Sequence, residues 1–286
     1  MHYKLHNLLI ISTLFFLFTN CDIINPEEPI PAYLEVDSIS LSHEINAIGI
    51  QDVWVDIDGN SLGVYELPAK FPVAKTGKTK VTLTPGIKVN GINEQRTYYP
   101  FYESIELNID LKPSETVVVN QTTTYTDWTN IAYSQPFEIT HDFSKYEGSD
   151  TSIYIRYEDY FEGGSCGAVY LDSINNSFII QSPSIDIPDL SGAPGMFLEL
   201  NFKTNTFVRV GYYILSGNEI ITTTPIYIVQ LVEKNTWTKL YIDLYNHLIK
   251  YNNSGYQYRI FMDGWIGDGK SEALFLLDDL KIIESN

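Results

Sequence analysis

The segment from Gly163 to Gly167 contains the residues whose types and spacing most directly suggest chemistry. It reads GGSCG and matches G-x-S-x-G, in which a serine nucleophile lies on a sharp turn between a strand and a helix. The residues that follow, AVYLDS, alternate as a strand does. Cys166 would act as a nucleophile only beside a base, and no histidine spacing in the chain predicts such a pair. The motif therefore predicts a glycine-rich loop, and we expect a protein that is not an enzyme.

Aromatic side chains are the second group with recognisable chemistry, because their flat rings pack on the apolar faces of sugars. The second half of the chain is rich in them, but alternation along a strand turns about half of them into the core. Trp265 follows Asp263-Gly264, which places it near a loop. It is the best candidate for an exposed sugar platform, and we expect Tyr256 and Tyr258 to share its exposed face and to bind the ligand with it.

The elements that must position these side chains are strands. The chain has 21 Tyr and 14 Phe besides many Val, Ile and Thr, residues that suit pleated, half-buried surfaces. Eight strand-like runs separated by Gly, Pro and Asn turns follow residue 150, and that spacing favours a jelly-roll sandwich. We expect an all-β protein with a small β-sandwich at 33–122, a polar Thr-rich linker at 123–134 and a jelly-roll β-sandwich at 135–286.

Two short stretches of the first sandwich allow more than one interpretation. Asp58-Gly59 lies between two strand-like runs and predicts a hairpin turn. The DIDGN stretch around it resembles a fragment of a calcium loop but lacks the distal glutamate and the flanking helices, so we favour the turn. The aromatic stretch Tyr98 to Tyr102 forms either a stacking surface or, as we favour, a hydrophobic plug against the second domain.

The N-terminus has the organisation of a secretory signal. Lys4 precedes an apolar run of 11 residues, Leu8 to Phe18, which is too short to span a bilayer and suits a signal peptide over residues 1–20. Cys21 follows this run directly, and residues 21–32 contain three prolines and two adjacent acids. Prolines favour extended conformations, so this stretch predicts a semi-rigid tether behind an anchor.

Phe18-Thr19-Asn20-Cys21 resembles the lipobox of bacterial lipoproteins, with Asn20 in place of the usual small residue. The resemblance, closest to Bacteroidota lipoproteins, implies cleavage before Cys21 and acylation of its thiol with palmitate-type chains. It also implies an outer-membrane lipoprotein anchored by lipid. Glu27 and Glu28 resemble a surface-export signal, which favours exposure at the cell surface over the periplasmic face.

The charge balance restricts the partners. The chain has 36 acidic and 18 basic residues and a net charge of −18, which repels nucleic acid. We expect no nucleic-acid partner. The acids are spread along the chain, which is typical of a folded acidic protein rather than of a disordered tail.

The first domain also resembles small PEGA-like sandwich domains. The resemblance lies in Asp52 to Gly63, Pro68, Pro72 and Gly77 to Gly86. It implies an Ig-like or PEGA-like β-sandwich that acts as a spacer or interaction domain without an active site.

The second domain resembles the jelly-roll domains of carbohydrate-binding modules and of MAM-like adhesins. The resemblance lies in SPSIDIP (182–188), WTKLYIDL (237–244), YRIFMDGW (258–265) and the closing FLLDDLKI. Such domains often hold one structural calcium through acids in the first and last strands, and four acids stand at matching positions: Glu158, Asp159, Asp278 and Asp279. The alternative is that these are solvated strand acids.

Two functions fit these observations. In the first, a surface lipoprotein binds a glycan or other extracellular ligand through its jelly roll, with the first domain as a spacer. In the second, the protein is an accessory structural subunit of an outer-membrane complex for secretion, outer-membrane protein assembly or nutrient uptake.

Overall fold

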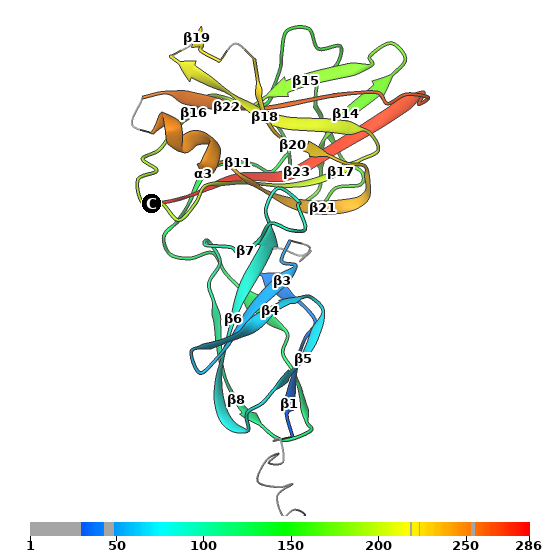
Figure 1. Ribbon diagram of the computed structural model, residues 1–286. Helices are drawn as coiled ribbons and strands as arrows, with labels where there is room; N and C mark the ends of the chain where they lie inside the picture. The colour runs from blue at the N-terminus through cyan, green and yellow to red at the C-terminus, as the bar shows by residue number, and fades with distance from the viewer. Residues whose placement is uncertain (1–29, 43–48, 218, 223, 253–254) are drawn as a thin grey trace, which may run out of the picture.

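The computed structural model describes residues 30–42, 49–217, 219–222, 224–252 and 255–286. Its described part is built almost entirely of strands, which form a smaller and a larger unit stacked along one axis (Figure 1). The expectation of an all-β protein is therefore confirmed. The predicted signal peptide, Cys21 and nearly all of the predicted tether lie outside the described residues. Within the described residues, no helix has the length and apolar character needed to cross a membrane.

The smaller unit is a sandwich of one large sheet and two short ones. The large sheet has the order β4-β3-β6-β7, and β8 also pairs with β6. The short sheets are β5-β1-β9 and β10-β2. The strands are β1 (Ala32–Val36), β2 (Ile39–Leu41), β3 (Asp52–Ile57), β4 (Asn60–Glu66), β5 (Ala69–Val73), β6 (Gly77–Lys88), β7 (Arg96–Tyr98), β8 (Ile105–Leu111), β9 (Thr116–Val118) and β10 (Gln121–Thr123).

The hairpin between β3 and β4 forms at the predicted turn. Ile57 pairs with Asn60, and the two residues between them, Asp58 and Gly59, have φ of 49° and 78°. Positive φ at both positions is what a two-residue turn of this kind requires. In contrast, Pro85-Gly86, which also resembles a turn in sequence, lies inside β6, with Gly86 opposite Asp52 of β3.

The larger unit consists of two sheets. The first has the order β13-β14-β23-β17-β21, with β11 also paired to β23. The second has the order β12-β15-β22-β18-β19, with β16 on β22 and β20 on β18. The elements are β11 (Thr129–Gln135), β12 (Ser144–Lys145), β13 (Tyr154–Arg156), β14 (Cys166–Asp172), β15 (Ser177–Gln181), β16 (Ile185–Asp186), β17 (Phe197–Thr204), β18 (Phe207–Ser216), β19 (Glu219–Ile220), β20 (Ile226–Leu231), β21 (Lys234–Asp243), α3 (Tyr245–Leu248), a 3-10 turn (Ile249–Tyr251), β22 (Gln257–Trp265) and β23 (Glu272–Ser285).

One strand of the larger unit lies in the segment expected to be a linker. β11 pairs antiparallel with β23, from Thr129 opposite Ser285 to Gln135 opposite Leu280. Residues 129–135 are therefore an edge of the larger sandwich. The strand shows weak alternation because a bulge after Ile131 shifts its register and most of its side chains are exposed or half-buried.

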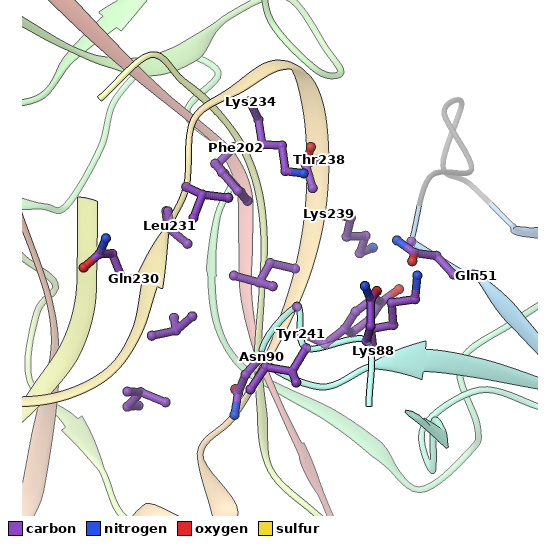
Figure 2. Close-up of a pocket in the computed structure, with 18 residues that line it drawn as sticks. Gln51, Lys88, Asn90, Phe202, Gln230, Leu231, Lys234, Thr238, Lys239 and Tyr241 are labelled. Carbon is purple, nitrogen blue, oxygen red and sulfur yellow. The ribbon is translucent and has the colours of Figure 1, made fainter. Parts of the chain in front are cut away.

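The junction between the units is buried on both sides. β17 is buried along nearly its whole length because Leu198 and Leu200 face the sandwich core while Phe197 and Glu199 face the smaller unit. Beside this junction lies a cleft of about 520 Å³, lined by residues of both units (Figure 2).

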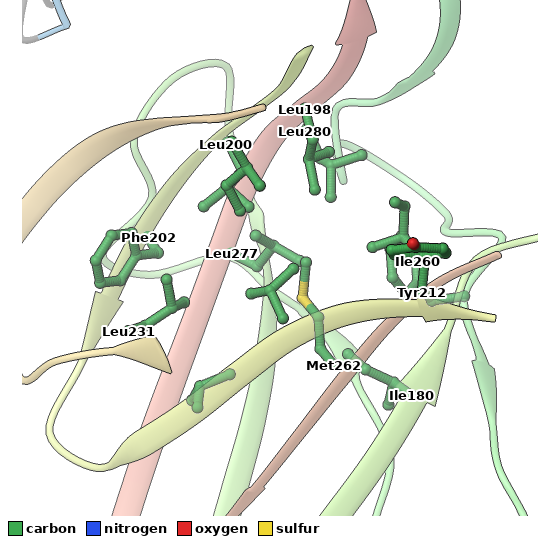
Figure 3. Close-up of a cluster of buried hydrophobic side chains, with 14 of the residues drawn as sticks. Ile180, Leu198, Leu200, Phe202, Tyr212, Leu231, Ile260, Met262, Leu277 and Leu280 are labelled. Atoms are coloured by element: carbon green, nitrogen blue, oxygen red, sulfur yellow. The ribbon is translucent and has the colours of Figure 1, made fainter. Parts of the chain in front are cut away.

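The core of the larger unit lies between its two sheets. Leu198 and Leu277 from one sheet point toward Ile260 and Met262 from the other (Figure 3). All four side chains are at most 1% exposed. Each contributes roughly 1.5–3 kcal/mol by leaving water, so a core of this size does not require a disulfide. Cys166 is accordingly a free, buried thiol.

Candidate functional site

Trp265 ends β22 on the outer face of the second sheet, the face turned away from the core. Alternation along β22 sends Tyr258, Ile260 and Met262 inward and leaves Trp265 41% exposed on the other side. β18 runs antiparallel beside it and places Phe207 directly opposite Trp265. Phe207 is 38% exposed, and the two ring centroids are 6.4 Å apart.

Two residues further along the same strands, Arg209 stands directly opposite Asp263. Arg209 donates two hydrogen bonds to the Asp263 carboxylate, from Nε to Oδ1 at 2.8 Å and from Nη2 to Oδ2. Tyr227, from β20 on the far side of β18, donates its hydroxyl to the same Oδ2 at 2.9 Å. One carboxylate thus holds side chains from two other strands in place.

The Arg209 guanidinium also contacts two aromatic rings. It lies 4.2 Å from the ring centroid of Tyr227 and 5.2 Å from that of Trp265. Tyr227 is 39% exposed. We name these five residues the outer-face cluster: Phe207, Arg209, Tyr227, Asp263 and Trp265.

The protonation states in the outer-face cluster follow from these contacts. The hydrogen bond to Asp263 raises the pKa of Arg209, and burial together with the hydrogen bond to Asp263 raises the pKa of Tyr227 to about 12. At neutral pH, Arg209 is therefore cationic and Tyr227 keeps its hydroxyl proton. Nη1 of Arg209 makes no hydrogen bond to another described residue, so it keeps N–H donors for a ligand.

A second, buried aromatic group continues the same face. Tyr213 and Phe261 have ring centroids 4.9 Å apart, and Tyr146 stacks on Tyr213 at 5.7 Å. Tyr213 and Phe261 are only 6% and 2% exposed. These rings support the sheet surface next to the outer-face cluster and leave little area for a ligand.

The expectation that Tyr256 and Tyr258 share an exposed face with Trp265 is wrong. Tyr258 is 0% exposed and lies in the core, and burial raises its pKa well above the usual value. Tyr256 packs partly buried against the same core. The reason is strand parity, because residue 258 points to the opposite side of β22 from residue 265.

The predicted plug around Tyr98 to Tyr102 is found at the junction. Tyr99, Phe101 and Tyr102 are at most 3% exposed and pack against Phe197 of the larger unit, whereas Tyr98 is 53% exposed. The stretch therefore serves mainly to join the units.

The four acids at the calcium-like positions are engaged by cations or backbone groups. Asp159 pairs with Lys203 at 2.6 Å, Asp279 with Lys281 at 2.7 Å and Glu158 with Arg156 at 3.0 Å. Asp278 is buried and accepts backbone hydrogen bonds from Phe161, Glu162 and Asp279. Burial raises the pKa of Asp278 to about 7. No group of three or more His, Cys, Asp or Glu side chains placed for a metal occurs in the part of the chain that the structure describes, so calcium binding stays a prediction.

The G-x-S-x-G stretch begins as an exposed turn at Gly163 and Gly164 and is buried from Ser165 onward. The Ser165 side chain is fully buried, and its hydroxyl donates to the carbonyl oxygen of Phe137 at 2.9 Å. Burial raises the pKa of the Cys166 thiol to about 12, which disfavours the thiolate. β14 begins at Cys166, inside the motif, so Cys166 lies in a strand and not in the predicted glycine-rich loop. The strand predicted for the residues after the motif is present.

Sequence reasoning missed two members of the outer-face cluster, Arg209 and Phe207, and did not assign Asp263 to a site. A partial signal was present, since Arg209 and Asp263 are charges inside two strongly apolar runs, FVRVGYYIL and RIFMDGW. A charge at such a position needs a partner on its own face. Which strands pair, and in which register, could not be read from the runs alone.

No family model matches the chain, and no match is found among curated proteins. Solved structures similar to it include a module titled as TmCBM61 in complex with β-1,4-galactotriose, with 12% identity over 49% of this chain and 85% of that one and a TM-score of 0.31. The CBM22-2 xylan-binding domain from Paenibacillus barcinonensis Xyn10C is 9% identical over 54% of this chain and 99% of that one, with a TM-score of 0.39.

The cleaved adhesin domain K3 of Lys-gingipain from Porphyromonas gingivalis is 11% identical over 54% of this chain and 98% of that one, with a TM-score of 0.37. Carbohydrate-binding modules are thus among the structures that this chain is similar to. At these TM-scores the likeness identifies neither a ligand nor an activity. The fold is defined by the strand order of the two sheets.

Proposed function

We propose that this chain is a non-catalytic carbohydrate-binding protein and that the outer-face cluster contacts the sugar. The observation that carries the proposal is the pair of half-exposed rings, Tyr227 and Trp265, which both contact the guanidinium of Arg209. Exposed aromatic rings held by a partly exposed ion pair are typical of a binding surface rather than of a core.

The chemistry of the outer-face cluster suits a sugar ring. A pyranose has apolar C–H faces and a rim of hydroxyl groups. The exposed ring surface of Trp265 and Tyr227 can cover the first, and the unbonded N–H groups of Arg209 can donate to the second. The bidentate bond to Asp263 already holds the guanidinium in place, so little side-chain freedom is lost on binding.

Two alanine variants test the proposal. A screen of neutral polysaccharides and oligosaccharides, followed by isothermal titration with those that bind, measures affinity for the unmodified chain, Trp265→Ala and Tyr227→Ala. We expect each variant to weaken binding by at least tenfold, or about 1.4 kcal/mol, as loss of a central aromatic contact does. Circular dichroism should show that both variants remain folded.

A matched control is available in Trp128, which is 49% exposed. Trp128 lines a second groove, together with Tyr98 and Pro194, and this groove is separate from the cleft of Figure 2. Trp128→Ala should leave affinity unchanged. If Trp128→Ala weakened binding and Trp265→Ala did not, the site would lie in that groove. If no saccharide bound, while purification from detergent-solubilised membranes recovered a stable protein complex, the accessory-subunit hypothesis would replace this one.

What supports the non-catalytic part is the burial of the groups that would be needed for covalent chemistry. Ser165 is fully buried and donates to backbone carbonyl groups, and Cys166 has a raised pKa. Incubation of the saccharides that bind with the purified chain should yield no shorter products.

We further propose that the chain is a lipoprotein of the outer membrane, anchored through Cys21 and exposed at the cell surface. The support is the signal-like residues 1–20 and the lipobox-like residues before Cys21. In Figure 1, β1 lies toward the end of the smaller unit away from the larger one, so an anchor preceding it would hold the sandwich away from the membrane. Cys21→Ser should abolish lipid labelling and shift the protein out of the membrane fraction. Unchanged mass and unchanged fractionation would contradict the anchor.

A further inference from the structure

The cleft beside the junction lies between segments of both units. Lys88 at the end of β6 and residues 90–93 after it form one wall. β20 forms another, together with residues 234 and 238–241 of β21 (Figure 2). Its volume of about 520 Å³ is within the range of small-ligand sites, which often lie at domain interfaces. It is separate from the outer-face cluster, whose residues do not line it.

The lining of the cleft has an unusual charge for this chain. It includes Lys88, Lys234 and Lys239, and none of the described lining residues is Asp or Glu. The whole chain has twice as many acidic as basic residues, 36 against 18. The described residues of this wall, with three cations and no acid among them, therefore depart from the acidic balance of the chain.

The three lysines contribute differently. Lys239 is buried and pairs with Glu199 at 3.2 Å, so this pair adds no net charge. Lys88 pairs at 3.1 Å with Glu66, whose side chain is 58% exposed and also bonds Arg96. The Lys88 side chain is only 15% exposed, but Glu66 is largely exposed and keeps its bond to Arg96, so a ligand can take the place of Glu66 beside Lys88.

Lys234 is the cation most open to a ligand. It is exposed, and its ammonium makes no ion pair with any described residue. The neighbouring acid Glu233 does not line the cleft and pairs with Lys270 at 2.7 Å. Lys234 and Lys88 are thus the two ammonium groups that a bound anion can approach.

Hydrogen bonds hold Tyr241 in place on the floor of the cleft, and Gly49 leaves the space above it open. Tyr241 on the floor accepts a backbone hydrogen bond from Asn90 and exchanges a hydroxyl hydrogen bond with Tyr102 at 2.9 Å. Position 49 has no space for a larger side chain, because a Cβ there would lie 2.3 Å from the Tyr241 hydroxyl oxygen. The side chains of Gln51 and Thr238 add polar groups beside the lysines.

We infer that this cleft is a second ligand site, and that it binds a carboxylate-bearing molecule of monosaccharide to disaccharide size through Lys88 and Lys234. We choose a carboxylate because Lys88 already donates a hydrogen bond to one, that of Glu66. Hydrogen bonds between charged groups are among the stronger polar contacts, and the mixed polar and apolar lining suits a sugar acid or another small organic acid.

The test is titration of the full chain with digalacturonic acid, with its neutral counterpart, a galactose disaccharide, and with citrate. We expect digalacturonic acid or citrate to bind and the neutral disaccharide not to bind at this site. Which of the two acids binds more tightly tells a sugar acid from a non-sugar acid. Binding should weaken as salt is raised, because both cations are partly exposed. Equal binding of the acidic and neutral disaccharides to the Trp265→Ala variant, or no binding of either acid at millimolar concentration, would overturn the inference.

Three variants locate the binding. Lys234→Gln and Lys88→Gln should each weaken acid binding by about tenfold, the usual effect of removing a charged hydrogen-bond partner. Lys250→Gln, at an exposed lysine outside the cleft, should have no effect. Lys88→Arg, which keeps the charge, should retain most of the affinity, so a loss in Lys88→Gln alone is not a folding effect.

Trp265→Ala separates this inference from the proposed function, because acid binding in the cleft should survive that change. If Trp265→Ala abolished acid binding while Lys234→Gln left it intact, the acid would bind at the outer-face cluster and the cleft site would be refuted.

Discussion

The molecule contains two clusters of aromatic rings around an ion pair, and they differ chiefly in exposure. The junction cluster consists of Tyr99, Phe101, Tyr102, Phe197 and Tyr241, with the pair Glu199–Lys239 beside it, whose side chains are each 1% exposed. In the outer-face cluster, the side chain of Arg209 is 35% exposed and that of Asp263 is 11% exposed.

The comparison shows how similar residue types serve two purposes. At the junction, both oxygens of the Glu199 carboxylate accept tyrosine hydroxyls, from Tyr99 at 2.6 Å and from Tyr125 at 2.9 Å. The Glu199 carboxylate is thus engaged by two tyrosine hydroxyls and by the Lys239 ammonium, all within the protein. On the outer face, rings and N–H groups remain open to solvent. The first arrangement holds two units together, and the second leaves interactions for a ligand.

The largest loss of folding stability is expected from a substitution in the junction cluster. Tyr99→Ala removes a fully buried ring and a hydrogen bond to Glu199, and should lower the free energy of unfolding by about 3–5 kcal/mol. Chemical denaturation measures it. The neighbour Tyr98 is 53% exposed, so Tyr98→Ala should cost less than about 1 kcal/mol. A loss below about 1 kcal/mol in Tyr99→Ala would mean that this junction contact contributes little stability.

The next effect concerns the buried ion pair. Glu199→Gln removes the buried carboxylate that pairs with Lys239 and accepts two tyrosine hydroxyls, and should destabilise the fold by about 3 kcal/mol. Adding Lys239→Met to this variant should recover part of the loss, because the buried ammonium that lost this carboxylate is then gone. A double variant as unstable as the sum of the two single variants would show that the pair is not coupled.

A third prediction concerns Asp278, a buried carboxylate whose protonation makes folding stability depend on pH. Asp278 receives only backbone N–H groups, and burial raises its pKa from 3.8 to about 7. Between these values the folded state holds a proton that the unfolded state has lost. This group therefore makes the fold less stable as pH rises from 4 to 7, and its effect levels off above 7.

The measurement is the stability difference between the unmodified chain and Asp278→Asn at several pH values. The variant should gain on the unmodified chain by about 2 kcal/mol between pH 5 and pH 7, given 1.4 kcal/mol per pH unit and incomplete burial. A difference that does not change with pH would show that Asp278 titrates at its usual pKa.

The smallest stability effect is expected at the outer face. Trp265→Ala removes a ring that is 41% exposed and should cost no more than about 1 kcal/mol of folding stability, although it should abolish most sugar binding. Thermal unfolding with and without a bound saccharide measures both. A loss of several kcal/mol would class Trp265 with the junction residues and weaken its assignment to a binding face.

Much of the fold could be predicted from local pattern. Alternating runs identified β17, β18, β21, β22 and β23, and Asp58-Gly59 identified the first hairpin turn. β11 was missed because a half-exposed edge strand with a bulge has little alternation. Pro85-Gly86 was misleading because a proline in a strand is tolerated where its missing N–H is not needed.

The candidate site could be predicted only in part. Trp265 was identified because a turn-like Asp-Gly precedes it, and it is exposed. Tyr258 was assigned to the same face because aromatic content was weighed without the parity of β22. Arg209 was missed because its partner Asp263 is 54 residues away in the chain.

Residue type and period two were sufficient to predict that this chain is built of strands and where the first hairpin turns. They were not sufficient to predict which ring is buried, which charges pair, or that a cleft with three lysines forms between the units. Alternation assigns side chains to two faces of a strand, but whether a face meets solvent, a second sheet or another unit depends on pairing between distant segments. Those pairings make one face of β17 a junction and leave one end of β22 open at Trp265.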